Sequence, residues 1–314
     1  MTTRKKPPAT PRMTRKTTRK RGRRNQRGGF SFFIVMCMMA AFAAFMHFGG
    51  DALFSNQYTG FHLNDYEIMV SFIDVGQGDS ILIHTNNHAV LIDSGEHRHR
   101  NTVLSYLNNA GIQRLDYVVA THPHSDHIGG LSTILGSIDV GRLLMPDATN
   151  NTVAFEQLLE SIESNDVPVI IPEIGYRLQI GLIDMTVIGP APGHHANLNN
   201  ASIILRMLHG HNTFLFTGDA EHEAEQFLLN SGTNLQAQVL KVGHHGSRTS
   251  TTQEFLDAVN PSVTIITVGA DNQFGHPHSE VMQRLQARNI PIFRTDQEGT
   301  IRIVTNGTEL FRRH

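Results

Sequence analysis

The chain has 314 residues, a length at which one large domain with an appendage is more usual than two full domains. The net charge of −2 averages two unlike parts, because 12 of the 26 basic residues lie between Arg4 and Arg27, whereas all 28 acidic residues lie at or after Asp51. From Asp51 onward there are 14 basic and 28 acidic residues, a balance that disfavours general nucleic-acid binding but not a nuclease with a local site. The single cysteine, Cys37, excludes a disulfide framework and a cysteine-based zinc site in the folded part.

The N-terminal part predicts a membrane anchor. Residues 1–28 are rich in Arg, Lys, Thr, Pro and Gly, and we expect a disordered basic cytoplasmic tail. Residues 30–48 contain no Asp, Glu, Lys or Arg, and at ~1.5 Å per residue such a run is just long enough to cross a bilayer. We therefore expect a transmembrane helix at 29–48 that contacts membrane lipid, a linker at 49–64 and a folded domain at 65–314.

The basic block before the apolar run predicts a cytoplasmic N-terminus and an extracytoplasmic domain, in a single-pass protein of the cell membrane. Ala41-Phe42-Ala43 resembles a signal-peptide cleavage site, but it lies inside the apolar run, so we prefer an uncleaved anchor. A nucleic-acid-binding arm is the alternative for the basic tail, although topology and attraction to anionic lipids explain it more simply.

From about Tyr66 the sequence alternates short β-type runs with helical ones. Strands are expected at 67–75, 80–85, 88–94, 115–121, 140–145, 167–171, 183–190, 201–208, 212–219, 237–246, 262–269, 291–295 and 300–305. Helices are expected at 102–111, 153–164, 221–232, 251–259 and 278–289. Two sheets packed face to face with helices outside satisfy this order, which predicts an α/β fold with four αββα layers.

The clearest candidate site is THPHSDHIGG at residues 121–130. His122 and His124 alternate on a loop that leaves a strand, so both can point at one metal ion, whereas Asp126 and His127 can face a second. A packing role explains this loop poorly, because a buried imidazole needs a hydrogen-bond partner and an exposed one needs nothing so specific. The loop therefore predicts a metal centre.

Later loops contain further candidates. Asp219 in FTGDAE could bridge two cations, cap the following helix, or do both. His244 and His245 in VGHHGS end another strand, and we expect one of them to bind metal and the other to hold a supporting or substrate contact. Lys241, in the strand before them, is expected to face solvent.

Other polar side chains are candidates for substrate contacts or for support of the metal ligands. Asp74 and Asp79 lie in the first loop and could support the histidines, with simple turn residues as the alternative. His276 and His278 could contact the substrate or protonate the leaving group, although His278 could equally be a polar residue at a helix N-terminus. The full set of these candidates is Asp74, Asp79, Asn200, Ser247, His276 and His278.

The sequence resembles the metallo-β-lactamase-fold domain of the ComEC-like competence family over roughly residues 66–310. The motifs that carry the resemblance are, in order, FIDVGQGDSILI, LIDSG, THPHSDHIGG, LNNASIILRM, FTGDAE, LKVGHHGSRTS, FGHPHSEVMQRL and RTDQEGTIRI. The resemblance implies an αββα sandwich with two divalent metal ions. The implied ligands are His122 and His124 for one ion, Asp126 and His127 for the other, Asp219 between them, and His244 or His245 at the second ion.

Ligation by nitrogen and oxygen alone suits zinc, manganese or iron, and we prefer zinc on the resemblance, with manganese as the alternative. The superfamily pattern has a further histidine ligand where this chain reads LNNAS at 198–202, which predicts a ligand-poor first metal. His194 and His195 lie nearby, in a loop that need not reach the metals. The chain also has one apolar run instead of the channel of full-length ComEC, so it cannot form a DNA pore by itself.

These features predict a membrane-anchored dinuclear metallohydrolase that cleaves phosphodiesters, with DNA as the substrate that the resemblance implies. Two metals ~3.5–4 Å apart would lower the pKa of a bridging water, and Asp126 or Asp219 would orient it or accept its proton. The acidic domain argues against polymeric DNA, so hydrolysis of a small ester, lactone or amide is the alternative. A third hypothesis is an inactive metal-binding partner of an envelope or DNA-uptake machine. The sequence does not indicate an oligomeric state.

Overall fold

The computed structural model describes residues 61–193 and 195–314. The basic tail, the apolar run, most of the linker and His194 lie outside this range, so the expectations for them stay predictions. Within the described range, no helix combines the length and the apolar character needed to cross a membrane.

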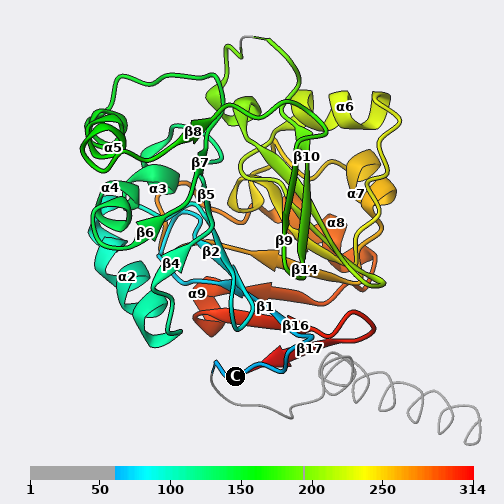
Figure 1. Cartoon of the computed structure of the whole chain (residues 1–314). Coiled ribbons are helices and arrows are strands. Elements are labelled where there is room, and N and C mark those ends of the chain that lie inside the picture. Colours follow the sequence, from blue (N-terminus) through cyan, green and yellow to red (C-terminus); the bar gives the residue numbers. More distant parts are fainter. Residues whose placement is uncertain (1–60, 194) are drawn as a thin grey trace, which may run out of the picture. The chain divides into compact units, whose positions relative to one another are not determined.

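Two β-sheets form the centre of the domain (Figure 1). The first has the order β17-β16-β1-β2-β3-β5-β7-β8. Its strands are β1 (Ile68–Phe72), β2 (Ile81–His84), β3 (Ala89–Ile92), β5 (Tyr117–Val119), β7 (Leu143–Leu144), β8 (Val169–Ile170), β16 (Ile301–Thr305) and β17 (Leu310–Arg313).

The second sheet has the order β15-β14-β13-β12-β11-β10-β9. Its strands are β9 (Arg177–Ile180), β10 (Ile183–Gly189), β11 (Ile204–His209), β12 (Asn212–Phe216), β13 (Val239–Lys241), β14 (Val263–Ile266) and β15 (Ile292–Arg294). A separate two-stranded sheet pairs β4 (Arg114–Leu115) with β6 (Asp139–Val140).

Helices cover the outer face of each sheet, which confirms the predicted αββα layers (Figure 1). Those over the first sheet are α2 (Arg100–Asn109), α4 (Leu131–Leu135) and α5 (Val153–Ser164), with the short α3 (Ser125–Ile128) beside them. Those over the second sheet are α6 (His222–Asn230), α7 (Gln253–Val259) and α8 (Ser279–Ala287). The short helix α9 (Thr295–Glu298) follows β15, and single 3₁₀ turns are formed by His97–His99, Leu198–Ala201 and Gly243–Gly246.

The two sheets face each other across one apolar core that contains residues from both. All five residues of β1 are buried, as expected for a strand covered on both faces, and this explains its nearly continuous apolar sequence. The rings of Phe72 on β1 and Phe216 on β12 lie 6.3 Å apart across the layer. The side chains of Thr152 and Thr252 cap α5 and α7 by accepting a hydrogen bond from the third residue beyond each.

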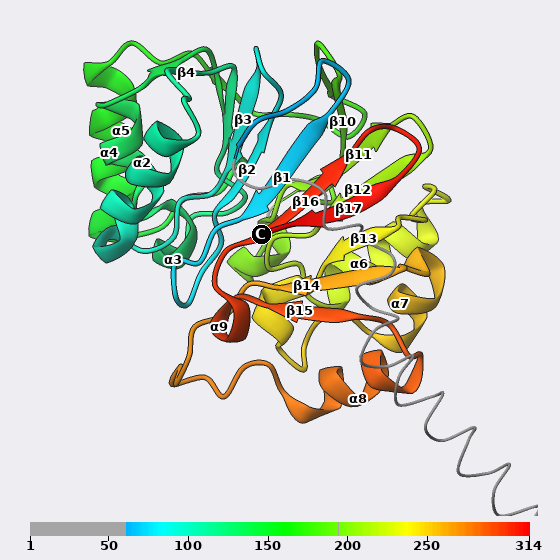
Figure 2. The same ribbon diagram turned by 90° about the horizontal axis from the view of Figure 1, so that it is seen from below.

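The end of the chain returns to the first sheet, where β16 pairs antiparallel with β1 and Ile68 lies opposite Thr305 (Figure 2). The sequence pattern predicts β16 but not the sheet to which it belongs, and it does not predict β9 or β17. Two predicted strands are shorter than expected, because the run at 140–145 divides between β6 and β7 and the run at 237–246 ends at Lys241.

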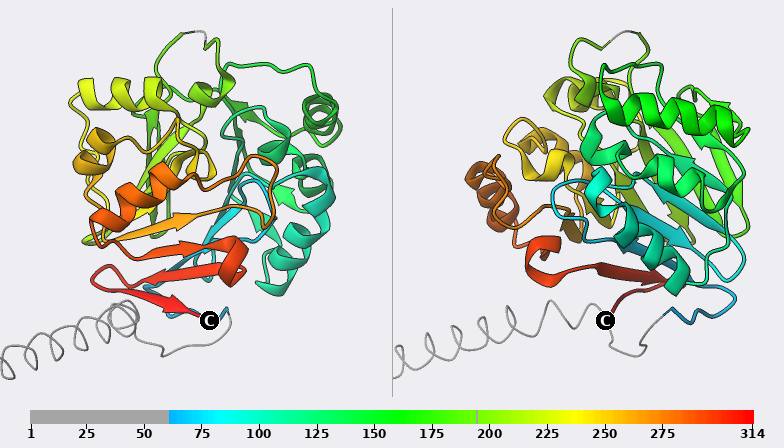
Figure 3. Two further views of the ribbon diagram at one scale, coloured as in Figure 1. Left: turned by 180° about the vertical axis from the view of Figure 1, so that it is seen from behind. Right: turned by 90° about the vertical axis from the view of Figure 1, so that its left-hand side faces the viewer.

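The parallel strands place the candidate loops along one edge of the molecule. In the first sheet β3 pairs parallel with β5, and in the second β12, β13 and β14 run parallel to one another. The carboxyl ends of parallel strands meet at the same edge of a sheet, where ligand sites are usual in layered α/β proteins. Figure 3 shows the loops from both sheets gathered between the two helical layers.

His84, at the end of β2, makes folding stability depend on pH. It is 2 % exposed, and neither ring nitrogen has a hydrogen-bond partner within the described range. Burial, together with the charge of Arg313, lowers the pKa of His84 from 6.5 to about 4. The unfolded chain therefore binds a proton below pH 6.5 that the folded chain does not bind until about pH 4.

We expect His84 to remove about 3 kcal/mol of folding free energy as the pH falls from 7 to 4, with only a small further loss below pH 4. Urea unfolding at pH 7, 5 and 4 should show that His84→Leu is less sensitive to acid than the wild type by this amount. An equal acid sensitivity in both proteins would contradict the assignment.

Candidate metal centre

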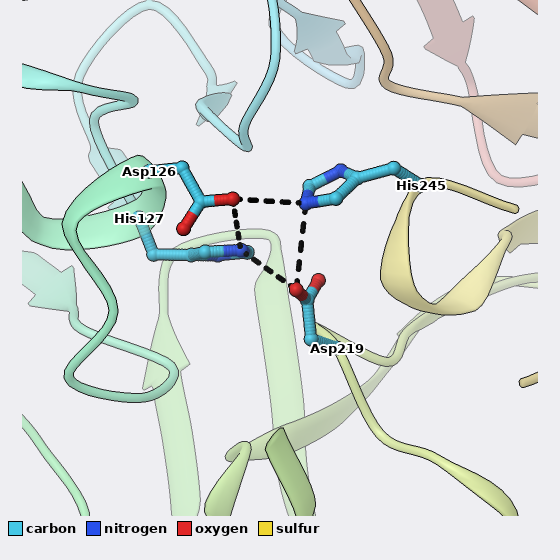
Figure 4. Close-up of side chains that lie close together, drawn as sticks. All are labelled: Asp126, His127, Asp219 and His245. Carbon is cyan, nitrogen blue, oxygen red and sulfur yellow. Dashed lines mark ion pairs between the residues drawn. The ribbon is translucent and has the colours of Figure 1, made fainter. Parts of the chain in front are cut away.

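Four side chains from three separate loops meet in one cluster (Figure 4). Asp126, His127, Asp219 and His245 each present one ligand atom, and these atoms all lie within 4.8 Å of one another. His127, Asp219 and His245 are buried, whereas the Asp126 side chain is 25 % exposed and so forms the open side of the cluster.

Local backbone geometry places these side chains. Asp126 and His127 lie in α3, directly beyond the end of β5. Asp219 follows β12 after Gly218, whose positive φ of 52° lets the chain turn beside Thr121 and Ser202. His244 and His245 follow β13 with φ angles of 48° and 54°. Two consecutive left-handed residues are uncommon outside glycine and mark a backbone held in place by its surroundings.

The distances within the cluster show that the carboxylates face the imidazoles. Oδ2 of Asp219 lies 3.2 Å from Nε2 of His127 and 3.4 Å from Nε2 of His245. Oδ2 of Asp126 lies 3.5 Å from Nε2 of His245 and 4.0 Å from Nε2 of His127. The two Nε2 atoms and two carboxylates therefore surround a common point.

The second nitrogen of each ring is held by an acceptor. Nδ1 of His127 lies 2.8 Å from Oδ2 of Asp93, and Nδ1 of His245 lies 2.9 Å from the carbonyl oxygen of Thr267. Each Nδ1 thus has an acceptor for its proton, and Nε2 is the nitrogen that faces the cluster. Both buried Nε2 atoms lack a hydrogen-bond partner in the part of the chain that the structure describes, and so the donor set fits a divalent cation.

The electrostatics of the cluster favour positive charge. Burial opposes a charge on His127, but Asp219 and Asp93 more than offset it and raise the pKa of His127 well above its usual value. Burial likewise opposes ionisation of Asp219, yet His127 and His245 hold its pKa well below the usual range. A buried site that stabilises cations so strongly suits a metal ion.

His122 and His124 lie beside this cluster and face each other. Nε2 of His122 is 3.0 Å from Nδ1 of His124 and 3.9 Å from Oδ2 of Asp219. Burial and the neighbouring charge of His127 lower the pKa of His122 well below 6.5. His122 is therefore the ring that lies near Asp219, and His124 contacts the ring of His122.

In the segment where the superfamily pattern has a further histidine, Ser202 takes a supporting position. Its Oγ lies 3.3 Å from Nδ1 of His122 and accepts a hydrogen bond of 3.0 Å from the backbone N–H of Asp219. Asn199 donates a hydrogen bond of 2.7 Å to Glu221. Nε2 of His195 lies 2.9 Å from the carbonyl oxygen of Ala191, in its own loop.

Three imidazoles line the rim of the cluster. Nδ1 of His244 lies 3.1 Å from Oε1 of Glu221, while its Nε2 is 3.7 Å from Oδ2 of Asp219. The ring of His276 is 5.3 Å from that of His244 and 4.8 Å from that of His278. His245 therefore points into the cluster and His244 lies at its edge, a choice that the sequence had left open.

The position of Lys241 differs from the one predicted from the sequence. It was expected to face solvent, but it is 1 % exposed, and its Nζ lies 2.5 Å from Oδ2 of Asp79 and 2.8 Å from the carbonyl oxygen of Gly218. The strand β13 runs in the middle of the second sheet, so its side chains are covered on both faces. Asp79 also accepts a hydrogen bond from Thr267 and lies 3.4 Å from Nδ1 of His245, as a supporting residue would.

The other candidates lie outside the cluster. Asp74 accepts a hydrogen bond of 3.0 Å from the backbone of Gly76, a turn role. Oδ1 of Asn200 accepts from the backbone of Glu221, and Oγ of Ser247 lies 2.9 Å from that of Thr249. Nδ1 of His278 accepts from the backbone of Arg248.

Sequence reasoning missed several residues that orient the ligands: Asp93, Thr121, Ser202, Glu221 and Thr267. Only Asp93 had a recognisable signal, because it ends a strand in LIDSG, as Asp219 ends one in FTGD. The others are common polar residues that become informative only when the fold brings them to the cluster.

The fold and this cluster are those of a known superfamily with a metal-dependent hydrolase fold. The sequence model of the Metallo-beta-lactamase superfamily matches residues 73–269, and the chain belongs to that family.

Within the superfamily, the chain resembles bacterial competence proteins. It is 36 % identical over 250 residues to ComE operon protein 3 of Bacillus subtilis and 33 % identical over 237 residues to competence protein ComA of Neisseria gonorrhoeae. Each match covers 74–75 % of this chain but 32 % of the relative, so the chain spans about a third of the length of these proteins.

Solved structures support the fold. The metallo-beta-lactamase fold protein YhfI of Bacillus subtilis matches with a TM-score of 0.50 at 13 % identity, covering 72 % of this chain and 95 % of YhfI. CmlA of Streptomyces venezuelae, a diiron beta-hydroxylase, matches with a TM-score of 0.50 at 15 % identity, covering 78 % of this chain and 55 % of CmlA.

Asp93→Asn should weaken metal binding about 10–100-fold, because the amide cannot hold the Nδ1–H of His127 as a carboxylate does. The shape of the residue is kept, and the remaining oxygen can still accept from the backbone N–H of Thr121, while the new NH2 group takes the place of the oxygen that faces Thr121 Oγ1 and His127. Competition with a chelator on the full-length protein measures the affinity.

Asp116→Asn is the matched control, because Asp116 also faces a histidine, with its Oδ2 3.2 Å from Nδ1 of His88, away from the cluster. It should leave metal affinity unchanged. Equal affinity in Asp93→Asn and wild type would show that Asp93 does not orient a metal ligand.

Proposed function

We propose that the protein is a membrane-anchored, dinuclear-metal phosphodiesterase that acts on DNA outside the cytoplasm. The observation that carries the proposal is the combination of an acidic, imidazole-bearing cluster with a rim of three further imidazoles. The first part suits divalent metals and the second suits an anionic substrate.

Asp126, His127, Asp219 and His245 would hold one metal, and His122 and His124, with Asp219 shared, would hold the other. When bound, two divalent cations supply a water of lowered pKa and stabilise charge on the attacked oxygen. Zinc is the metal we propose, and manganese is the alternative, because the donors are nitrogen and oxygen alone.

The chain's own residues have separate tasks at the site. Asp126 is the partly exposed carboxylate of the cluster, with Oδ2 facing the imidazoles and the side chain 25 % exposed, so it is placed to hold a proton of the attacking water. Asp219 is buried and faces the imidazoles, so its task is to bind the metal ions and not to exchange a proton with solvent. His127 and His245 are kept in one orientation by Asp93 and Thr267.

Imidazole N–H groups at the rim favour a phosphate over a neutral carbonyl substrate. His244, His276 and His278 can each donate to a phosphoryl oxygen, and such donors to an anion are roughly twice as strong as neutral hydrogen bonds. The competence proteins among the relatives agree with DNA as the source of that phosphate. The net acidity of the domain then restricts contact with the strand to this local site.

The membrane anchor is proposed from the apolar run at 30–48 and the basic residues before it. In this arrangement the N-terminus is cytoplasmic and the hydrolase domain is not. The basic tail would lie against anionic lipids of the inner surface.

The activity is tested by metal analysis of the full-length protein, followed by assays on single-stranded DNA, bis(p-nitrophenyl) phosphate and a chromogenic β-lactam. We expect bound divalent metal and hydrolysis of the two phosphodiesters. Asp126→Ala and Asp219→Ala should each lower the rate at least about 100-fold, more than the loss of a supporting group would.

Asp139→Ala, an exposed carboxylate on β6, is the control and should keep full activity. Turnover of the β-lactam alone would replace the proposal by a carbonyl hydrolase. Metal binding without turnover of any substrate would favour an inactive partner of a larger machine.

Topology is tested with reporters fused after His314 in living cells. A reporter that works only outside the cytoplasm should be active, and one that works only inside should not. The opposite pattern would overturn the proposed orientation without affecting the chemistry of the site.

A further inference from the structure

We propose that a hollow beside the metal cluster binds a nucleobase of the substrate strand, with the base stacked on Phe274. This inference rests on the proposed function and narrows the substrate from any phosphodiester to one that carries a base. The hollow of about 650 Å³ lies between the loop that joins β1 to β2, the turn after β3 and the loop that joins β14 to α8. Figure 2 shows the last of these loops beside α9.

Two residues of the wall are close in sequence to groups that support the metal cluster. Gln77 in its wall is two residues from Asp79, and Gly269 is two residues from Thr267. Those two neighbours are the groups that face Nδ1 of His245. Its volume falls in the range of small-molecule sites.

Phe274 supplies an aromatic surface at the hollow. It is 52 % exposed, so one face of its ring is open to a ligand. Its ring stacks on that of His276 at 5.6 Å and an interplanar angle of 25°. The ring of His276 lies 5.3 Å from that of His244, so an aromatic series leads from Phe274 to the rim of the cluster.

Asn272 holds this loop in shape. Its side-chain amide donates to the carbonyl oxygens of Gly269 and His276 at 2.9 and 2.6 Å. Its oxygen accepts from the backbone N–H groups of Phe274 and His276 at 3.2 and 2.9 Å. The exposed ring is therefore presented by a fixed loop, which lowers the entropy cost of stacking on it.

An unpartnered donor in the wall gives an independent sign of a polar ligand. Gln77 is 6 % exposed, and its Oε1 accepts a hydrogen bond of 3.3 Å from Gly269. Its Nε2 has no hydrogen-bond partner among residues 61–193 and 195–314. A buried amide donor left unpaired costs free energy, and a carbonyl oxygen of a base would satisfy it.

The charges of the wall favour the base over the phosphate. Asp74, Glu96, Asp271 and Asp296 line the hollow. Glu96 is paired with Arg98 at 2.9 Å and Asp296 with Arg294 at 2.6 Å, which leaves Asp74 and Asp271 as the carboxylates without an ion pair among the described residues of the wall. Phosphate groups would be repelled from this wall, whereas the amino and imino N–H groups of a base can donate to its carboxylates. A nucleobase has a carbonyl acceptor for Gln77, N–H donors for the carboxylates and a flat face for the ring of Phe274.

The test compares two fluorescein-labelled single-stranded oligonucleotides of equal length and charge, one of thymidines and one of abasic residues. Hydrolysis and equilibrium binding are measured with the metal-loaded full-length protein. Phe274→Ala should raise KM and Kd for the thymidine strand about tenfold and leave kcat nearly unchanged, since one stacked base is lost. Values for the abasic strand should not change.

Phe274→Tyr should behave like wild type and Phe274→Leu should be intermediate, because the flat aromatic face is the feature required. Tyr66→Ala is the matched control, as Tyr66 is also an exposed aromatic residue, at 59 %, outside the hollow. It should change neither strand's binding.

Equal effects of Phe274→Ala on the two strands, or no preference of the wild type for the thymidine strand, would overturn the base site. The proposed hydrolase would survive that result as long as the wild type cleaves both strands. If the wild type cleaves neither but still prefers the thymidine strand through Phe274, the base site stands and the proposed function falls.

Discussion

Lys241 carries its ammonium group into the interior, where Nζ lies 2.5 Å from Oδ2 of Asp79 and 3.8 Å from Oδ1 of Asp219. Asp79, Asp93 and Asp219 are each at most 1 % exposed, and so much buried negative charge is expensive unless it is paired. This one fixed cation, with the imidazoles of His127 and His245, is what allows carboxylates to be gathered there. The acidic cluster thus depends on a lysine buried in the second sheet.

The same contacts join the two halves of the domain. Asp79 comes from a loop of the first sheet, whereas Lys241 lies in β13 and Thr267 directly follows β14 of the second. Asp219, also from the second half, faces His127 from the first. Any cation bound at this seam would therefore stabilise the packing of the sheets on each other as well as the site, because binding favours the folded state.

Sequence pattern was sufficient for the layers and for the ligand-bearing loops, because both are local properties of short segments. The contacts that support the ligands could not be predicted from the sequence, because they join residues far apart in the chain. Asp93 and His127 are 34 residues apart, and Lys241 and Asp79 are still more widely separated in the sequence. The burial of Lys241 depends on its strand's central place in the sheet order, which β-type runs alone do not reveal. Which of His244 and His245 faces the cluster depends on the left-handed backbone conformation of both residues. A histidine in the sequence does not predict that conformation.

The hairpin of β16 and β17 also bears on how the domain folds. Because β16 pairs with β1, one edge of the first sheet is completed by residues more than two hundred positions further along the chain. Closing so large a loop is slow and leaves the edge of β1 without its partner until the last residues are available. During synthesis the early strands must therefore wait for the later ones, and a chaperone would protect them from aggregation.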